Sequence, residues 1–463
     1  MIRLFRVSIP TSVLLLILAE ILLAFVCFLI PVWIAEPQAP EIFLMYEGGI
    51  LKVSIAVGTL VLGIYFHDLY ENFRVTSRSF LFAQFCTAVG IVMLVQALLA
   101  YLNQDLNLSG WLALAGSALA LGILPCFRIF YSRAVVRIVG QQRLLFVGEN
   151  ELVEEVGRQI GKHPEKGYAG VGYLSDSADL ALAPGVGPYL GRPADVETVA
   201  KNLKPSAIVV GLKERRGQLP VYPLMDLRLL GYYVQEVSAL HEALTGRISI
   251  RTLRPSQLVF SDELGPKPNQ IFVKEVTSFI IALCALVVLG PVMLVVAALV
   301  RMTSPGPALY KQKRVGFNGK VFQVYKFRSM YQDAEARTGA VWAKKDDPRV
   351  TPLGKWLRKL RLDELPQVFN VLKGEMSIVG PRPERPEFVN TLSEQIPFYS
   401  QRHFVKPGIT GWAQINHKYG DTIEDTISKL EFDLYYIKHM SPSLDVYIIF
   451  HTVKVMVLSR GAQ

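Results

Sequence analysis

Four long apolar stretches in the first third of this 463-residue chain restrict its fold more than any other feature. They cover residues 11–33, 49–66, 80–102 and 111–131. Each is close to the ~20 residues that a helix needs to cross a bilayer. A mean hydropathy of +0.31 agrees, because so high a value excludes a disordered chain and is unusual for a soluble enzyme. The sequence therefore predicts a membrane protein whose residues 1–140 form a unit of four transmembrane helices.

Arginine residues predict how this unit is oriented. They precede the first stretch, lie between the second and third, and surround the end of the fourth, as Arg3, Arg6, Arg74, Arg78, Arg128, Arg133, Arg137 and Arg143. The other two loops carry acidic residues but no Lys or Arg. Because basic residues favour the cytoplasmic side of a membrane, we expect both ends of the unit to face the cytoplasm.

From residue 143 onward, short apolar strands alternate with helical stretches, which predicts a small parallel sheet. We expect strands over residues 144–147, 207–212 and 232–237, and helices over residues 151–160, 194–203 and 223–230. The first strand is followed by Gly148-Glu149-Asn150, so the glycine-rich loop that holds a dinucleotide phosphate is absent. We therefore interpret residues 141–262 as a Rossmann-like domain with a regulatory or scaffolding role, in preference to dinucleotide binding.

A fifth apolar run, residues 276–300, contains Gly290-Pro291 near its middle. Proline removes a backbone donor and kinks a helix. Lys274 precedes this run and Arg301 follows it, with further basic residues beyond each. Because both flanks are basic, we expect both to lie in the cytoplasm, and we predict a re-entrant helix that enters one leaflet and returns. A plain kinked span is the alternative.

Positive charge is concentrated between Lys311 and Arg361. This block holds fourteen Lys and Arg against four acidic residues, an excess equal to the net charge of +10 of the whole chain. It indicates an anionic partner, which could be nucleic acid, an acidic membrane face or a phosphorylated substrate. Within the block, residues 351–361 have the pattern of a basic amphipathic helix with Trp356 on its apolar face. This helix could lie in the lipid headgroup layer or pack its apolar face against the core of the domain, and the sequence leaves both alternatives open.

Two adjacent carboxylates, Asp363 and Glu364, follow that helix directly, and Pro366 is suited to open the next one. Acidic residues at a helix start are common as capping groups. Here they stand beside many cations, which an enzyme needs when it brings one phosphate to another, usually with a divalent metal. The rigid turn Gly380-Pro381-Arg382-Pro383 presents an arginine suited to bind phosphate oxygens, and Lys326 and Arg328 offer two more cations.

Four motifs in order give the C-terminal part a specific resemblance. They are Tyr325-Lys326-Phe327-Arg328-Ser329-Met330, Leu362-Asp363-Glu364-Leu365-Pro366-Gln367, Gly380-Pro381-Arg382-Pro383 and Lys406-Pro407-Gly408-Ile409-Thr410-Gly411. Over about 190 residues this part resembles the bacterial sugar transferase family, the polyprenyl-phosphate phosphoglycosyltransferases with a monotopic catalytic core. The whole layout resembles the large members that start exopolysaccharide or O-antigen synthesis. The resemblance implies an α-rich catalytic domain over residues 263–463, with the re-entrant helix at residues 276–300.

The resemblance also implies a reaction. An undecaprenyl-phosphate glucose/galactose phosphotransferase moves hexose-1-phosphate from a UDP-sugar to undecaprenyl phosphate and releases UMP. Asp363 matches the family's nucleophile, which forms a covalent phosphosugar intermediate, and Glu364 matches the acid that helps to hold Mg²⁺. The residues expected to bind substrate are Lys326, Arg358, Arg382, Asp433 and Gln414 from the resemblance, with Arg328 added for its place beside Phe327.

Four positions depart from the family's pattern. Arg361 stands where a serine is usual, and Lys406 stands where an arginine is usual. Glu275 and Ser278 replace a basic and an acidic residue that are common early in the re-entrant helix. These departures bear on details of the site, because the Asp-Glu pair and the Pro-Arg-Pro turn are intact.

The resemblance assigns the positive block to two anionic partners, the membrane lipid and the UDP-sugar, and nucleic acid is no longer expected. We expect a multi-pass protein of the bacterial inner membrane with its catalytic domain on the cytoplasmic face. The oligomeric state stays open, a homodimer included. A glycosyltransferase that moves sugar without phosphate is one alternative, although no Asp-x-Asp motif is present. An inert membrane scaffold is another, whereas a transporter is disfavoured because Glu20 alone is charged well inside the four stretches.

Overall fold

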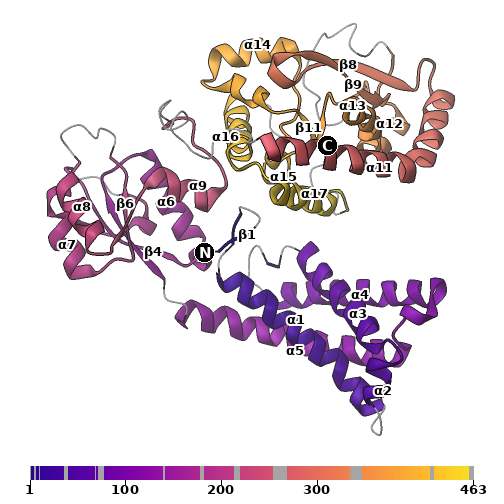
Figure 1. Cartoon of the computed structure of the whole chain (residues 1–463), viewed down its shortest axis with the longest axis horizontal. Coiled ribbons are helices and arrows are strands. Elements are labelled where there is room, and N and C mark those ends of the chain that lie inside the picture. Colours follow the sequence, from indigo (N-terminus) through magenta and orange to yellow (C-terminus); the bar gives the residue numbers. More distant parts are fainter. Residues whose placement is uncertain are drawn as a thin grey trace. The chain divides into compact units, whose positions relative to one another are not determined.

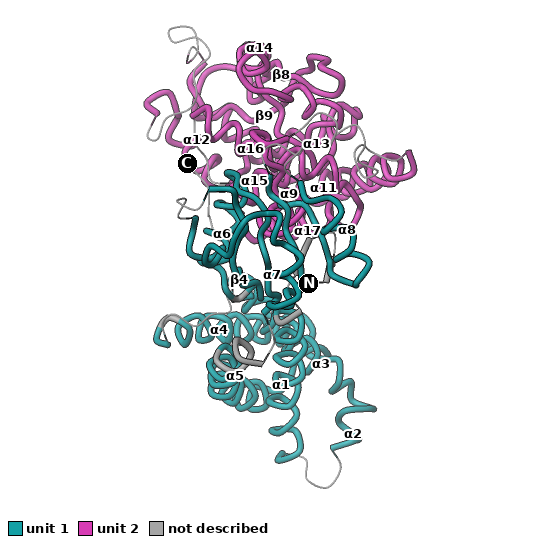
Figure 2. The backbone as a smooth tube through the Cα atoms, turned by 90° about the vertical axis from the view of Figure 1, so that its left-hand side faces the viewer, with its two compact units in different colours: residues 1–2, 8–237 teal, residues 3–7, 238–463 magenta. Residues whose placement is uncertain are grey.

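The structure of the protein is a computed structural model. It describes residues 2–4, 7–9, 11–35, 40–67, 69–70, 78–138, 141–177, 182–212, 219–253, 268–332, 334, 347–417 and 422–457. The chain divides into two compact units, residues 1–2 with 8–237 and residues 3–7 with 238–463 (Figure 2). Each unit is described by itself.

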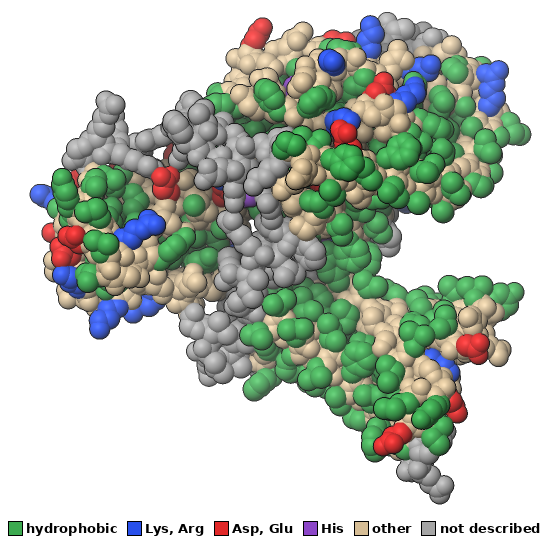
Figure 3. All heavy atoms as spheres, viewed as in Figure 1, with side chains coloured by type: hydrophobic (Ala, Val, Ile, Leu, Met, Phe, Trp, Pro, Cys, Tyr) green, Lys and Arg blue, Asp and Glu red, His purple; other side chains and the backbone are tan. Residues whose placement is uncertain are grey.

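Helices cover all four apolar stretches of the first unit (Figure 1). The helices are α1 (Thr11–Ala35), α2 (Pro40–Met45), α3 (Gly49–Phe66), α4 (Arg78–Leu102) and α5 (Gly110–Ile138), after a short strand pair β1 (Ile2–Leu4) and β2 (Val7–Ile9). One buried apolar cluster joins α1, α3, α4 and α5. The visible surface of these helices is mostly hydrophobic, and its charged side chains lie near α2 (Figure 3). Four of the helices are long and apolar enough to cross a membrane, and α11 of the second unit is a fifth.

A buried ion pair connects α1 to α5. The carboxylate oxygens of Glu20 accept hydrogen bonds from Nε and Nη2 of Arg128, both at 2.7 Å. Nη1 of Arg128 donates to the Leu69 carbonyl at 2.9 Å, and the guanidinium lies 5.1 Å from the centre of the Tyr70 ring. Arg128 was expected among the charges that mark the cytoplasmic side. It is instead 1% exposed inside the bundle, so the orientation depends on the other arginines.

The predicted parallel sheet is confirmed, with strand order β5-β4-β3-β6-β7 and every pairing parallel. Its elements are β3 (Gln142–Val147), α6 (Glu151–Lys162), β4 (Tyr168–Leu174), β5 (Tyr189–Gly191), α7 (Val196–Leu203), β6 (Ala207–Val210), α8 (Val221–Leu229) and β7 (Tyr233–Glu236). Counted from β3, this order is the 3-2-1-4-5 of Rossmann folds. An added Cβ on Gly148, which directly follows β3, would lie 2.6 Å from the Leu212 side chain, so Leu212 packs closely against this glycine.

The second unit is mainly helical, with two small two-stranded sheets, β8-β9 antiparallel and β10-β11 parallel. Its elements are α9 (Val237–Thr245), α11 (Pro268–Thr303), β8 (Leu309–Val315), β9 (Val321–Phe327), α12 (Pro352–Lys359), η6 (Leu362–Gln367), α13 (Val368–Leu372), β10 (Ser377–Val379), α14 (Pro386–Gln395), η7 (Tyr399–Phe404), β11 (Gly408–Thr410), α15 (Trp412–Asn416), α16 (Ile423–His439) and α17 (Pro442–Val457). The largest buried apolar cluster of this unit includes Trp412 with residues of α16 and α17.

Residues that follow the sheet directly pack on this second unit. Glu242 of α9 accepts a hydrogen bond from Lys438 at 2.9 Å and also contacts His439. The indole nitrogen of Trp412 donates to the Gly246 carbonyl at 2.7 Å, and Ile248 belongs to the buried cluster around Trp412. The compact unit therefore starts ahead of the α11 helix and includes a segment that the sequence pattern grouped with the sheet.

Helix α11 runs over 36 residues with Pro291 inside it. Lys274, near its start, donates to the Val379 carbonyl at 2.8 Å and to a carboxylate oxygen of Asp445 at 2.8 Å. Ser304, directly after its end, accepts hydrogen bonds from Arg328. Both ends of this apolar helix are therefore bound to the same compact unit.

The amphipathic stretch before the two carboxylates is α12. The hydroxyl of Thr351 caps its start by accepting a hydrogen bond from Gly354 N at 2.9 Å. Leu357 is buried against the core of the unit, whereas Trp356 is 63% exposed and Leu360 is 52% exposed. Leu353 is half-buried and packs against the same cluster as Leu357, so α12 docks two apolar side chains on the domain and leaves Trp356 and Leu360 uncovered.

Candidate active site

A cavity of about 450 Å³ in the second unit brings together all the residues that the sequence proposed for a site. Asp363, Glu364, Lys326, Arg328, Arg358, Arg382, Gln414 and Asp433 all line it. They come from seven elements or loops spread over more than a hundred residues of sequence. Their individual roles stay predictions.

The two carboxylates lie in the 3-10 turn η6, which connects α12 to α13. Arg361 precedes the turn with φ of +58°, a left-handed conformation that costs a non-glycine residue about 1 kcal/mol. Pro366 was expected to open the next helix, but the turn already begins at Leu362 and Pro366 lies inside it. Asp363 and Glu364 therefore occupy the first half of a helical turn, where backbone N–H groups favour negative charge.

Glu364 is held by cations on several sides. Its Oε1 accepts hydrogen bonds from Nζ of Lys326 and Nη2 of Arg382, both at 2.8 Å. A guanidinium nitrogen of Arg361 lies 4.0 Å from its Oε2. Burial favours the neutral acid, but Arg382 and Lys326 outweigh it and hold the pKa of Glu364 well below the ordinary value. Glu364 is therefore an anion in a fixed position.

Asp363 differs from its neighbour in its surroundings. It is 8% exposed and lines the cavity, and within the described part of the chain its carboxylate accepts no hydrogen bond. Burial and the charge of Glu364 raise the pKa of Asp363, against the opposing effect of Lys326, Arg358 and Arg382. Adjacent acids whose pKa values are driven apart are typical of acids with different roles in one reaction.

Two of the expected substrate-binding arginines are already engaged by protein groups. Arg328 is 6% exposed, and its Nη2 donates to the Ser304 carbonyl at 2.7 Å and to the Ser304 hydroxyl at 2.8 Å. Nε of Arg358 donates to the Ser329 hydroxyl at 3.1 Å. Arg328 therefore fixes the end of α11 through Nη2 as well as forming part of the cavity wall, and its Nε and Nη1 have no partner among the described residues. Arg358 likewise keeps donors for a ligand.

Gln414 and Asp433 line the cavity from α15 and α16. The Gln414 amide donates to the Ile409 carbonyl at 3.2 Å, and its buried oxygen has no partner among the described residues. Asp433 is 1% exposed and forms an ion pair of 2.8 Å with Arg402. Burial raises the pKa of Asp433 to about 6, against the opposing effect of Arg402.

Sequence reasoning missed several residues of this site. Arg314, Tyr399 and Arg402 line the cavity, and Arg402 binds Asp433. No motif singles these residues out, because the acidic partners of the two arginines, Glu384 for Arg314 and Asp433 for Arg402, lie far away in the sequence. Only the position of Arg402, four residues before the Lys406-Pro407-Gly408 motif, could have suggested it.

The lining as a whole is cationic. The described residues around the cavity include ten Lys and Arg and four acidic residues. The ten are Arg314, Lys326, Arg328, Arg349, Arg358, Arg361, Arg382, Arg385, Arg402 and Lys429. Six of them belong to the positive block between residues 311 and 361. A cavity with this excess of positive charge is suited to an anion with several charges, such as a diphosphate.

The fit of a magnesium ion can be judged from the available oxygen atoms. The acidic residues that line the cavity are Asp363, Glu364, Glu384 and Asp433, and the first two are adjacent in the chain. Among the residues that the structure describes, no group of three or more His, Cys, Asp or Glu side chains is placed to hold a metal. Magnesium nevertheless fits the pair, because it commonly takes one or two carboxylates and completes its coordination with water and substrate phosphates.

Comparison with known proteins identifies the class to which this fold and site belong. The sequence model of the bacterial sugar transferase family matches residues 269–459. A Xanthomonas campestris pv. campestris protein named UDP-glucose:undecaprenyl-phosphate glucose-1-phosphate transferase is 34% identical over 77% of this chain and 75% of its own length. A Klebsiella pneumoniae protein of the same name is 32% identical over 93% of this chain and 84% of its own. The chain belongs to the bacterial sugar transferase family.

A further relative matches a shorter part of the chain more closely. The Aeromonas hydrophila protein named UDP-N-acetylgalactosamine-undecaprenyl-phosphate N-acetylgalactosaminephosphotransferase is 46% identical over 232 residues. That match covers 50% of this chain and only 53% of the Aeromonas protein. The relatives therefore carry names with different sugars.

Proposed function

We propose that this protein transfers a hexose-1-phosphate from a UDP-sugar to undecaprenyl phosphate and releases UMP. The observation that carries the proposal is the pair of adjacent carboxylates in a cationic cavity, one held by cations and one without a hydrogen bond. The names of the relatives support the same type of reaction. Such a step would start the synthesis of a repeat unit for exopolysaccharide or O-antigen.

In the proposed first step, a carboxylate oxygen of Asp363 attacks the phosphorus that bears the sugar. A bond forms between this oxygen and the phosphorus, the bond from the phosphorus to the bridging oxygen breaks, and UMP leaves with that oxygen. In the second step, an oxygen of undecaprenyl phosphate attacks the same phosphorus and releases the Asp363 carboxylate. A carboxylate is a competent nucleophile toward phosphorus when cations withdraw charge from the phosphate.

The cations around Asp363 supply that help. Lys326 and Arg382 are fixed by their bonds to Glu364, so they need little rearrangement when the diphosphate binds. Arg358 is bound through one nitrogen and keeps its other donors for phosphate oxygens. Glu364 would also hold Mg²⁺ together with substrate phosphate, and the ion would neutralise part of the diphosphate charge.

We also propose that α11 is re-entrant and keeps the second unit on the cytoplasmic face of the inner membrane. Lys274 and Ser304, at its two ends, are bound to the same compact unit. A straight span would separate its ends by the ~30 Å thickness of the hydrocarbon core. Labelling of single cysteines beyond each end of α11 in intact cells tests this, and labelling of the distal flank from outside would contradict it.

The identity of the hexose needs a direct test. Two relatives that match three quarters or more of their own length are named for glucose, whereas the Aeromonas protein is named for N-acetylgalactosamine. Glucose is our first candidate and galactose the second. Membranes containing the protein would be incubated with undecaprenyl phosphate and UDP-glucose, UDP-galactose or their N-acetylated forms, and UMP would be measured.

The decisive variant is Asp363→Asn. We expect turnover and the covalent phosphosugar adduct both to disappear, while expression and membrane location persist. Glu394→Gln is the matched control, because Glu394 is an exposed carboxylate of the same unit outside the cavity. Release of UDP in place of UMP would indicate a transferase that moves sugar without phosphate. Unchanged turnover in Asp363→Asn would refute the covalent mechanism.

A further inference from the structure

The turn that presents Arg382 is held by hydrogen bonds to its backbone carbonyl groups. Five carbonyl groups from Val379 to Glu384 each accept a hydrogen bond from a residue that lies outside this segment. The donors are Lys274 Nζ to Val379 O at 2.8 Å, Gly408 N to Pro381 O at 3.0 Å, Arg402 Nη2 to Arg382 O at 3.0 Å, Arg314 Nη1 to Pro383 O at 3.0 Å, and Val315 N to Glu384 O at 2.9 Å. Two of these donors are guanidinium groups, and they act on consecutive residues.

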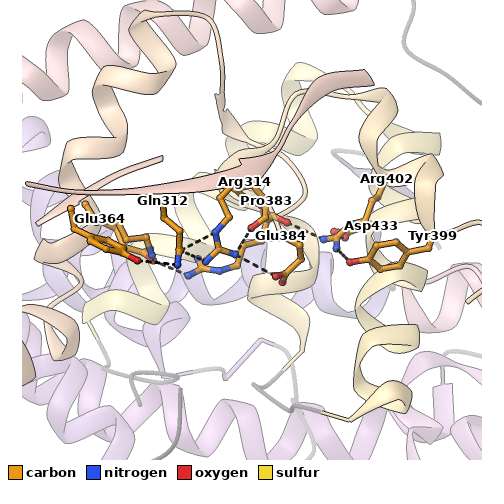
Figure 4. Close-up of polar contacts among 11 residues, drawn as sticks. Gln312, Arg314, Glu364, Pro383, Glu384, Tyr399, Arg402 and Asp433 are labelled. Carbon is orange, nitrogen blue, oxygen red and sulfur yellow. Dashed lines mark hydrogen bonds and ion pairs between the residues drawn. The ribbon is translucent and has the colours of Figure 1, made fainter. Parts of the chain in front are cut away.

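Each of the two guanidinium groups is itself fixed (Figure 4). Arg402 is 7% exposed and donates to the Tyr399 hydroxyl at 2.7 Å, and it forms the ion pair with Asp433. Arg314 donates twice to Oε1 of Gln312, at 3.1 Å and 2.7 Å. Arg314 also lies 3.3 Å from a carboxylate oxygen of Glu384. We call Arg314 and Arg402 the arginine clamp.

The clamp acts on a segment that has little freedom of its own. Pro381 and Pro383 fix φ on either side of Arg382 and supply no N–H of their own. With their carbonyls bound as well, the Cα of Arg382 has a defined position, and its guanidinium reaches Oε1 of Glu364 at 2.8 Å. A cation that is to meet a phosphate must be held within a fraction of an ångström to be fully effective.

We propose that Arg314 and Arg402 are positioning residues that hold the Arg382 turn in the geometry needed for phosphoryl transfer. Asp433, which the resemblance placed among the substrate-binding residues, acts through Arg402 in this scheme, because its carboxylate is bound to that guanidinium. The proposal rests on the proposed function, since it assigns these residues to the same reaction. The alternative is that Arg402 binds the substrate directly, because it also lines the cavity.

A double-mutant cycle on the full-length protein in membranes distinguishes a positioning role of Arg402 from direct binding of the substrate. The variants are Arg402→Lys, Arg382→Lys and the double variant, with kcat and KM for the UDP-sugar measured by UMP release. Lysine keeps the charge but cannot bond the Arg382 carbonyl, Tyr399 and Asp433 together. Positioning predicts that Arg402→Lys lowers kcat roughly 100-fold with KM changed less than about three-fold. It also predicts that the double variant is scarcely slower than Arg382→Lys alone, since both changes act on one contact.

Direct binding predicts a different pattern, in which KM rises in Arg402→Lys and the effects of the two substitutions multiply. That result would overturn the proposal. Arg247→Lys is the control for a conservative change at a partly buried arginine outside the cavity, and it should keep wild-type kinetics. If Arg402→Lys does not reach the membrane, Tyr399→Phe removes a single bond to Arg402 and should lower kcat several-fold at constant KM.

The same preparation also tests the proposed function separately. Wild-type release of UMP and its loss in Asp363→Asn establish the reaction before the cycle is interpreted. Absence of UMP release from the wild type would count against the proposed function. Full wild-type kcat in both Arg402→Lys and Tyr399→Phe would count against the arginine clamp alone.

Discussion

The four N-terminal helices and the second unit each bury a glutamate against arginine, but the two arrangements differ in balance. In the first unit, Glu20 and Arg128 bind each other through two hydrogen bonds, and the remaining Arg128 nitrogen has the Leu69 carbonyl. In the second unit, one oxygen of Glu364 accepts bonds from Lys326 and Arg382. Glu20 and Arg128 form a neutral pair that bonds mainly with itself, whereas Glu364 lies beside a cavity among more cations than it can neutralise.

The difference separates a structural pair from a functional one. A buried ion pair whose donors and acceptors are all matched has no free group to bind a ligand. Removing one partner is therefore expected to lower the stability of the fold. A buried anion surrounded by surplus cations holds those cations in position for a second anion. Removing that anion is therefore expected to lower the rate of the reaction. The predictions below test this division, beginning with the largest effect.

The largest effect is expected at Glu364. Glu364→Gln removes the anion that fixes Lys326 and Arg382, and we expect kcat/KM to fall at least 1,000-fold, about 4 kcal/mol of transition-state stabilisation. The apparent melting temperature in detergent should change little, because the freed cations remain beside the cavity. UMP release and thermal unfolding of the same samples measure both. Turnover within ten-fold of wild type would show that the charge of Glu364 is dispensable.

The Glu20–Arg128 pair should show the reverse, a large loss of stability with little loss of activity. Arg128→Met leaves Glu20 buried without a partner and should destabilise the helix bundle by about 3–5 kcal/mol. The double variant Glu20→Leu with Arg128→Met should recover much of that loss, because both charges are then absent. Unfolding in detergent measures stability, and UMP release by the molecules that stay folded should be close to normal. A double variant as unstable as the single one would contradict a purely structural pair.

A smaller effect is expected on the pH dependence of the reaction. In the proposed mechanism Asp363 attacks phosphorus in its ionised form, so activity should fall as the pH drops through its pKa, which burial and Glu364 raise above the ordinary value. Arg358 lowers this pKa, and its removal should raise it. In Arg358→Gln the acid limb of kcat/KM should therefore move to higher pH. A limb that stays in place or moves to lower pH would show that another group controls it.

Much of this arrangement could be predicted from the sequence, because its signals are local. Apolar length predicted the helices, and the alternation of strands and helices predicted the parallel sheet, which is confirmed. The strand at Tyr168–Leu174 was missed, since two glycines interrupt its apolar pattern. The Asp363-Glu364 pair and the Pro-Arg-Pro turn carry short motifs, and the structure brings them to one cavity.

What could not be predicted depends on contacts between distant residues. Arg314 and Arg402 act on one turn but stand 88 positions apart, so no spacing connects them. Two of the departures from the family pattern, Glu275 and Lys406, form an ion pair of 2.6 Å, which neither position shows alone. Ser278 receives a hydrogen bond from Ile378 N at 3.4 Å. These substitutions are explained only when the chain is folded.

The attachment of Lys274 has a consequence for how the protein would sense its bilayer. This side chain belongs to the apolar helix α11, yet it donates to the carbonyl that directly precedes the Arg382 turn. With α11 embedded as proposed, the lipid acceptor is reached by lateral diffusion in two dimensions. A thinner or thicker leaflet would tilt α11 and pull on Val379, one residue from the turn. Lipid chain length would then tune turnover without any change in substrate concentration.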